Sequence, residues 1–143
     1  MFLGEYQNSI DAKGRAIIPA KFREELGESF VITKGLETCL FIYPMSQWEK
    51  FQEKIADLPL TSKESRAFVR RFFAGAVECG LDKQGRVNIP QHLREHAKID
   101  KELVTIGVNE RIEIWAKDGW DSYCEDIDDD YEEILQGISG LGI

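Results

Sequence analysis

The stretch DAKGRAIIPAKFREEL at residues 11–26 decides the fold, because the chain repeats it as DKQGRVNIPQHLREHA at residues 82–97. At a constant offset of 71 residues, Asp, Gly, Arg, Ile, Pro, Arg and Glu recur in the same order. Flanking apolar and aromatic residues recur as well, which lengthens each copy to roughly 45 residues. A copy of that size buries little core by itself, so the two halves are expected to fold together.

The repeated unit has a clear local structure. Asp11 can accept hydrogen bonds from backbone N–H groups just downstream, and Gly14 supplies a backbone conformation that most residues avoid. Arg15 then leaves the turn and enters a short apolar strand. Pro19 suits the first position of a helix. Each copy therefore predicts a turn, an arginine, a strand and a short helix.

Between and after the repeats, periodicity predicts further elements. Strands are expected over residues 2–9, 15–18, 30–33 and 39–43, with counterparts in the second half. Helices are expected over 20–26, from an N-cap at Ser46 to the Leu58-Pro59 break, from Thr61 or Ser62 onward, and from near Asp118 to Ile127, extending toward Leu135. Trp120 and Tyr123 are expected to pack in the second half as Trp48 and Phe51 pack in the first. The fold class is α+β with a mainly β core.

Composition narrows the class of protein. A chain of 143 residues with 43% hydrophobic content can form one domain with a real core. No stretch approaches the roughly 20 apolar residues of a membrane span, and the N-terminus lacks a signal-peptide pattern. The three scattered cysteines favour reduced thiols in a cytoplasm over a disulfide framework.

The net charge of −8 is unlike the basic footprint of most nucleic-acid binders, but it is unevenly distributed. Residues 118–143 hold nine acidic residues and no Lys or Arg, so residues 1–117 carry a net charge of +1. The acidity belongs to a C-terminal tail. Because the body is nearly neutral, any basic contact with a nucleic acid is local and weak. Several such contacts would have to act together to give a useful affinity.

The paired turns are the strongest candidate site. In a purely structural interpretation, Asp and Gly build the turn and Arg pairs with the carboxylate. Two such turns in register instead suggest two arginine prongs related by pseudo-twofold symmetry, and Arg suits phosphate and guanine. The first loop is favoured because Lys13 precedes its glycine, where the second has Gln84. The candidate DNA-binding residues are Asp11, Lys13, Gly14 and Arg15, and in the second loop Asp82, Lys83, Gly85 and Arg86.

Other candidates are weaker. A basic helix face with Lys63, Arg66, Arg70 and Arg71 is interpreted as a solvated surface or as a source of intersubunit ion pairs. His92 and His96 share a helix face but have no third ligand nearby in sequence, so no metal site is predicted. An Asp-rich run at 126–130 lacks the glycine and glutamate of a calcium loop. No catalytic constellation, cofactor motif or small-molecule substrate site is recognisable, and the chain is not expected to be an enzyme.

The sequence resembles the bacterial MraZ family in its opening MFLGEY, in both Asp-x-x-Gly-Arg turns, and around Ala74-Gly75 and residues 104–108. The resemblance covers Met1 to about Tyr123. One departure is Asn8, where many relatives carry His. The resemblance implies two tandem SpoVT/AbrB-like repeats that form one pseudo-dimeric, double swapped-hairpin β-barrel with flanking helices. The expected boundaries are 5–47 and 76–119 for the repeats, 48–74 for a helical connector and 120–143 for the acidic helix and tail.

The resemblance also implies a function. MraZ proteins form rings of several subunits and bind short direct repeats of promoter DNA through Asp-x-x-x-Arg loops. They regulate, commonly repress, the division and cell-wall gene cluster that includes their own gene. A cytoplasmic, nucleoid-associated homo-oligomer is therefore expected. The alternative is a ring-forming scaffold or antitoxin-like protein-binding module, because AbrB-like folds also occur in antitoxins. A steep loss of affinity with salt would favour DNA.

Overall fold

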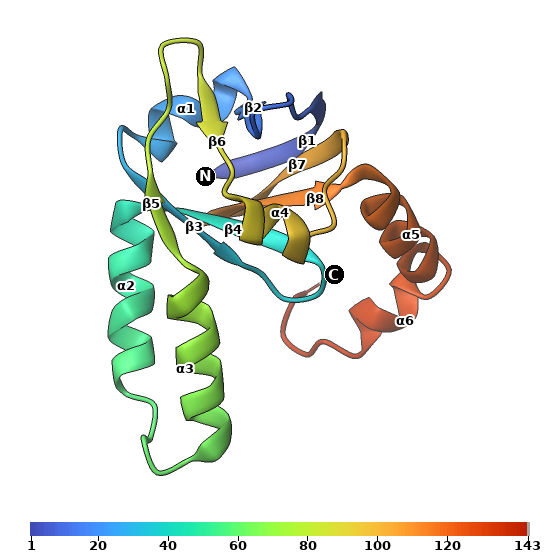
Figure 1. Ribbon diagram of the computed structural model, residues 1–143. Coiled ribbons are helices and arrows are strands. Elements are labelled where there is room, and N and C mark those ends of the chain that lie inside the picture. The colour runs from blue at the N-terminus through green and yellow to red at the C-terminus, as the bar shows by residue number, and fades with distance from the viewer. Residues whose placement is uncertain (143) are drawn as a thin grey trace.

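A computed structural model describes residues 1–142 and has a mixed α+β fold built on antiparallel sheets, as predicted (Figure 1). The strands are β1 (Phe2–Ser9), β2 (Arg15–Ile17), β3 (Phe30–Lys34), β4 (Cys39–Pro44), β5 (Val77–Cys79), β6 (Arg86–Asn88), β7 (Glu102–Asn109) and β8 (Arg111–Ala116). The helices are α1 (Ala20–Leu26), α2 (Met45–Ala56), α3 (Lys63–Gly75), α4 (Gln91–His96), α5 (Lys117–Asp128) and α6 (Tyr131–Gln136).

The two halves of the chain are interlocked through both sheets. The six-stranded sheet has the order β1-β7-β8-β4-β3-β5. Its first strand pairs antiparallel with β7 of the second half along its full length, and β5 pairs antiparallel with β3 of the first half. The second sheet contains only β2 and β6, one strand from each half. Each repeat thus completes the sheet of the other, so neither half is an independent unit.

The six-stranded sheet separates two apolar cores. One core lies between the sheet and the β2–β6 pair with α1 and α4, and it includes Ile18 and Ile89, both fully buried. The other core, on the opposite face, is aromatic and is covered by α2, α3 and α5. There Trp48 packs on Tyr43 in the first half and Trp120 packs on Trp115 in the second. The predicted equivalence of the two aromatic helices is confirmed.

Several predicted boundaries need correction. Helix α2 begins at Met45 with Pro44 as its N-cap, and Ser46 makes no capping hydrogen bond. Proline fixes a backbone angle suited to the start of a helix, so the helix starts two residues earlier than the capping-box pattern predicts. Ser62 does cap α3, where its hydroxyl accepts from the Ser65 N–H. The closing helix is two helices, α5 and α6, separated at the acidic residues 129–130.

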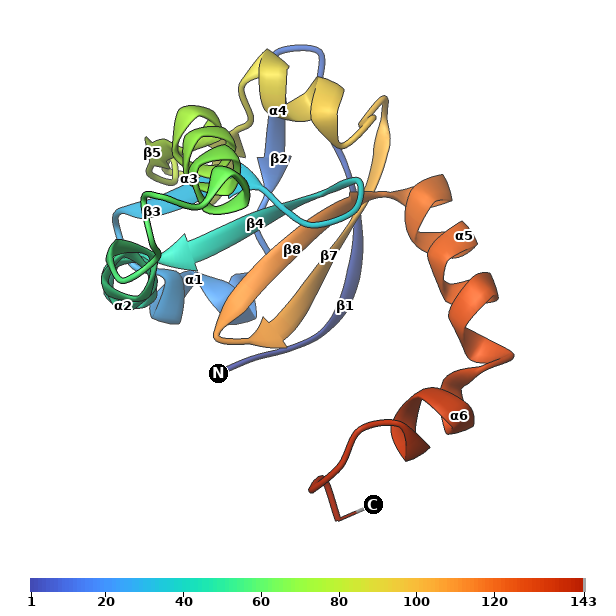
Figure 2. The same ribbon diagram turned by 90° about the horizontal axis from the view of Figure 1, so that it is seen from below.

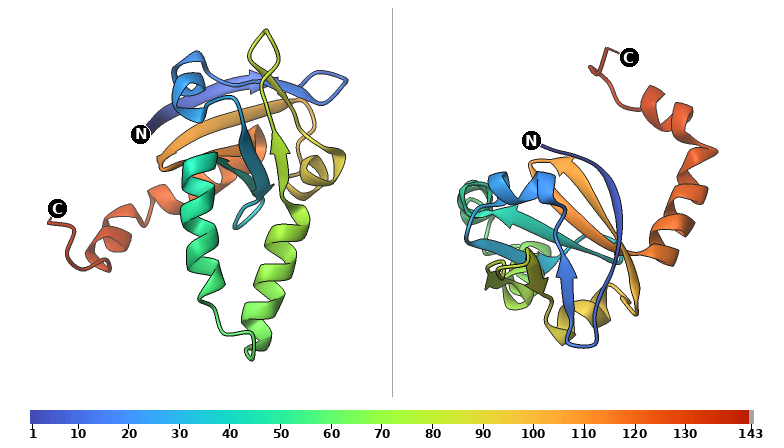
Figure 3. Two further views of the ribbon diagram at one scale, coloured as in Figure 1. Left: turned by 90° about the vertical axis from the view of Figure 1, so that its left-hand side faces the viewer. Right: turned by 90° about the horizontal axis from the view of Figure 1, so that it is seen from above.

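The helices outside the two sheets extend from the body in different directions. Helices α2 and α3 form a hairpin whose tip lies at the end of the molecule opposite the β5–β6 loop (Figure 1). Helices α5 and α6 extend from the body on another side (Figures 2 and 3). Across residues 1–142, no helix combines the length and the apolar character needed to cross a membrane. Cys39, Cys79 and Cys124 carry free thiols.

Candidate nucleic-acid interface

The first loop, residues 11–14, is built around one carboxylate. Asp11 Oδ1 accepts hydrogen bonds from the backbone N–H groups of Lys13 and Arg15, both at 2.9 Å. Its Oδ2 accepts from Arg15 Nε at 2.7 Å. Gly14 donates its N–H to the Asp11 carbonyl and adopts φ +82°, a conformation strongly disfavoured for side-chain-bearing residues. The carboxylate therefore fixes both the turn and the direction in which the arginine leaves it.

The second loop, residues 82–85, repeats this geometry. Asp82 Oδ1 accepts from the backbone N–H groups of Gln84 and Arg86 at 2.9 Å, and Oδ2 accepts from Arg86 Nε at 2.8 Å. Gly85 has φ +78°. Both arginine side chains are partly exposed, at 30% for Arg15 and 24% for Arg86. Within residues 1–142, no acceptor takes a hydrogen bond from the Nη groups of either arginine, so these donors remain available to a ligand.

The loop carboxylates should titrate below their usual range. Hydrogen bonding from the Arg15 backbone N–H, followed by the Arg15 side chain, lowers the pKa of Asp11 from 3.8. The pKa of Asp82 is lowered in the same way by Arg86. Because folding lowers these pKa values, the ionised carboxylates stabilise the loops above about pH 4, and this contribution is lost as the pH falls through the folded pKa. NMR titration should give both groups lower pKa values in the folded chain than in loop peptides.

The two loops open onto one two-stranded ribbon. Strands β2 and β6 pair antiparallel, with Ala16 opposite Val87 at the centre. These two residues are buried, so their neighbours face outward. The outward face carries four side chains: Arg15, Ile17, Arg86 and Asn88. Arg15 lies opposite Asn88, and Arg86 is two residues from Asn88 along β6. The two arginine Cα atoms are therefore about 8 Å apart. The predicted prongs are therefore parts of one surface.

Each loop is braced by the opposite repeat. Ile89 donates its backbone N–H to the Gly14 carbonyl at 2.8 Å, and Ile18 donates to the Gly85 carbonyl at 2.9 Å. Arg23 of α1 donates from Nε to the Ile18 carbonyl, and its guanidinium lies against Gly85. Arg94 of α4 bonds the Ile89 carbonyl and lies against Gly14. These crossed contacts hold the two loops in a fixed mutual orientation.

The bracing arginines were not singled out as functional from the sequence, although the signal was present. Arg23 and Arg94 recur at the same offset of 71 residues as the loop residues, which marked them as part of the repeated unit. A third missed residue is Asn8, whose side-chain amide donates to the Ile17 carbonyl at 2.7 Å. Asn8, which stands where many relatives carry His, thus holds the end of strand β2 through this hydrogen bond.

The other predicted site residues border the ribbon. Lys13 and Lys83 are exposed beside the loop carboxylates, one in each repeat. The combined surface therefore has two lysines and two arginines, with two carboxylates held inside the turns. Nothing in this geometry distinguishes the first loop from the second, and the preference for the first remains a prediction.

The two histidines of α4 make different contacts. His92 Nε2 lies 3.3 Å from the Gly75 carbonyl. The ring of His96 is half-buried, and its Nε2 is buried without a partner among the described residues. The part of the chain that the structure describes contains no cluster of three His, Cys, Asp or Glu able to hold a metal ion.

Comparison with known proteins places the chain in a family. The profile described as "MraZ protein, putative antitoxin-like" matches residues 1–71 and again residues 72–136. A protein of Caldanaerobacter subterraneus subsp. tengcongensis is 56% identical over 143 residues, and one of Clostridium tetani is 57% identical over 143 residues, each covering both chains completely. One of Carboxydothermus hydrogenoformans is 57% identical over 136 residues, or 95% of each chain. All three are named transcriptional regulator MraZ. The chain belongs to the MraZ family, with two tandem MraZ domains.

Proposed function

We propose that the protein is a sequence-specific DNA-binding transcriptional regulator that binds promoter DNA through the outward face of the β2–β6 ribbon. The observation that carries the proposal is the pair of guanidinium groups, each fixed by a loop carboxylate through Nε while its Nη groups remain available. Relatives that match the chain over its whole length carry the name of a transcriptional regulator.

The shape and chemistry of the ribbon suit the major groove of B-DNA. That groove is about 12 Å wide and admits a two-stranded β-ribbon, and arginine is the side chain that most often reads guanine there. Arg15 and Arg86, about 8 Å apart, would reach base edges together. Ile17 could contact a thymine methyl group, and Asn88 could bond a base edge or the backbone. Fixing each guanidinium in advance lowers the entropic cost of the contact.

Lys13 and Lys83 would then position the ribbon on phosphates. Phosphate contacts orient a protein on the duplex without reading sequence. We expect Lys13→Ala and Lys83→Ala to weaken binding about equally on specific and random DNA, and each to reduce the salt slope by roughly 1. Fluorescence anisotropy over a salt series measures both quantities. A lysine variant that changed only specific binding would indicate base contact instead.

A near-neutral body implies that several ribbons act together. We infer a homo-oligomeric ring in which successive ribbons engage successive direct repeats, so that linkage multiplies modest affinities. The proposed target is the division and cell-wall gene cluster that includes its own promoter, with repression as the expected effect. We also infer that the interlocked halves correspond to the double swapped-hairpin barrel, with repeats over 5–47 and 76–119, a connector over 48–74 and an acidic tail over 120–143.

The acidic tail is proposed to limit binding to random DNA. Helices α5 and α6 lie away from the β5–β6 loop in the views of Figure 3. Deleting residues 125–143 should therefore raise affinity for random DNA, but the deletion also removes α6. A sharper variant replaces Glu125, Asp126 and Asp128 by their amides and leaves α6 in place. We expect it to bind random DNA more tightly at low salt than the wild type does, and an unchanged affinity would contradict this role.

A protein-binding module is the second candidate, favoured by the words "antitoxin-like" in the family description. The deciding experiment measures binding of the full chain to a fragment carrying its own upstream region, against a scrambled fragment, between low and physiological salt. Specific binding that falls steeply with salt supports the DNA-binding proposal. Equal, weak binding to both fragments would overturn it and favour the protein-binding module.

A further inference from the structure

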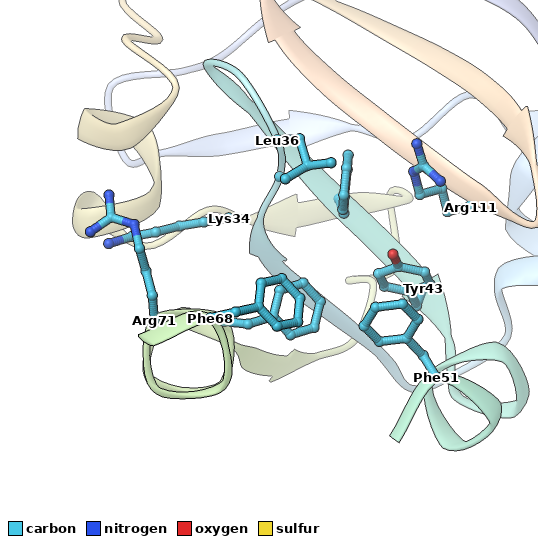
Figure 4. A pocket seen from close by; sticks show the side chains of 10 residues that line it. Lys34, Leu36, Tyr43, Phe51, Phe68, Arg71 and Arg111 are labelled. Carbon is cyan, nitrogen blue, oxygen red and sulfur yellow. The ribbon is translucent and has the colours of Figure 1, made fainter. Parts of the chain in front are cut away.

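A hollow of about 290 Å³ remains open on the aromatic face of the six-stranded sheet, beside α2 and α3 (Figure 4). Its floor and walls are apolar, formed mainly by Phe41, Tyr43, Phe51, Phe68 and Phe72. Leu36, at its edge in the β3–β4 turn, is 65% exposed, and Phe68 on α3 is 37% exposed. Apolar side chains gathered around a hollow with polar residues at its rim are typical of a docking site.

One end of the hollow is positively charged. Lys34 and Arg71 lie side by side there (Figure 4). Among residues 1–142, neither has a carboxylate within salt-bridge distance. Burial, and then these two cations, lower the pKa of the nearby His96. Arg111, by contrast, is paired with Glu113 and lies over the Phe41 ring. Arg71 belongs to the basic face of α3, and among residues 1–142 neither Arg71 nor Lys34 has a charge partner.

The C-terminal segment has the complementary character and also lacks a partner. None of the residues of α6 is buried. Ile138, which is 49% exposed, lies just beyond the end of α6. Within α6, Tyr131 and Ile134 are 55% and 42% exposed, and their spacing of three places them on one helical face. Glu132 and Glu133 lie between them in sequence. The segment is therefore an acidic amphipathic helix whose apolar side is left in water.

We propose that α6 of one subunit docks in the aromatic hollow of a neighbouring subunit, with its glutamates facing Lys34 and Arg71. Intermolecular docking follows from the anchoring of α5, whose Trp120 and Tyr123 pack on Trp115 and carry α6 outward from its own body (Figures 2 and 3). Helix and hollow are different surfaces, so the contact is heterologous and can close a ring. The inference rests on the proposed oligomer and supplies its interface.

Mixing two variants that each carry one added cysteine tests the contact directly. Leu36→Cys and Ile134→Cys proteins are purified separately, mixed, allowed to exchange subunits and oxidised. We expect a disulfide-linked dimer of about twice 16.4 kDa on non-reducing gels. The matched control mixes Ile134→Cys with Lys21→Cys, an exposed position on α1, and should give no more than the background from the native cysteines. A further protein carries both Leu36→Cys and Ile134→Cys in one chain. If its disulfide forms only within that chain, α6 occupies its own hollow and the proposal is overturned.

Charge reversal provides an independent test. We expect Arg71→Glu to reduce the mass of the assembly measured by light scattering, and the added Glu133→Arg change to restore it. Gln136→Glu, which alters α6 without touching the proposed pair, should leave the mass unchanged. A wild-type mass of 16.4 kDa, or a full-size assembly in Arg71→Glu, would overturn the docking. The DNA-binding proposal fails separately, because an intact assembly without specific binding would contradict only that proposal.

Discussion

Arg15→Ala and Arg86→Ala should each abolish most specific DNA binding while leaving the fold and the assembly intact. A base-reading arginine is worth roughly 1–3 kcal/mol per engaged subunit, and this loss multiplies when several ribbons bind one promoter. The stability effect should be small, because both side chains are partly exposed and surface ion pairs contribute at most about 1 kcal/mol. Anisotropy with a promoter fragment measures the first effect, and light scattering with thermal unfolding measures the second.

Controls can separate base contact from charge alone. Lys54→Ala removes one positive charge from α2, whose hairpin lies far from the β5–β6 loop (Figure 1), and should leave specific binding unchanged. Arg15→Lys keeps the charge but loses the planar fork that bonds the Asp11 carboxylate and a guanine edge together. If Arg15→Lys binds as well as the wild type, Arg15 contacts phosphate and not a base. If only one of the two alanine variants loses binding, that loop is the reader.

Much of the fold could be predicted from the sequence, because the residues of the repeat favour particular turns, strands and helices locally. The turn residues Asp11 and Gly14 require a defined backbone conformation, and the same residues recur 71 positions later. Helix α1 was predicted with its observed bounds, since a proline precedes it and Gly27 ends it. The family assignment was confirmed, because two copies of one motif are far more specific than one.

The relation between the two loops was not accessible in the same way. Sequence spacing showed that two arginine turns exist, but not that β2 and β6 pair and bring them onto one face. Long-range pairing depends on contacts between residues about 70 positions apart, and local propensity carries no information about them. The roles of Arg23 and Arg94 were missed for the same reason, because each braces the loop of the opposite repeat.

The crossed bracing makes Gly85→Ala the most disruptive small substitution expected near the site. At φ +78° an alanine is strained by about 1–2 kcal/mol. Its Cβ would also collide with Arg23 Cζ, so the guanidinium must move and lose its hydrogen bond to the Ile18 carbonyl. At Gly14 the nearest atom, Arg94 Cζ, is 3.1 Å away, and the displacement is smaller. Gly85→Ala should therefore cost about 2–3 kcal/mol of folding free energy and Gly14→Ala about 1–2 kcal/mol.

A double-mutant cycle with Arg23→Ala isolates the bracing from the backbone strain. Without the Arg23 side chain, the alanine at position 85 meets no guanidinium, and its cost should fall to the strain of about 1–2 kcal/mol. Urea unfolding at one fixed protein concentration measures each corner, because the stability of an oligomer depends on concentration. If Gly85→Ala lowers the folding free energy equally with and without the Arg23 side chain, the contact with Arg23 contributes nothing to the effect of the substitution. A reduced cost accompanied by lost promoter binding would show that Arg23, which the proposal keeps away from DNA, acts by positioning the second loop.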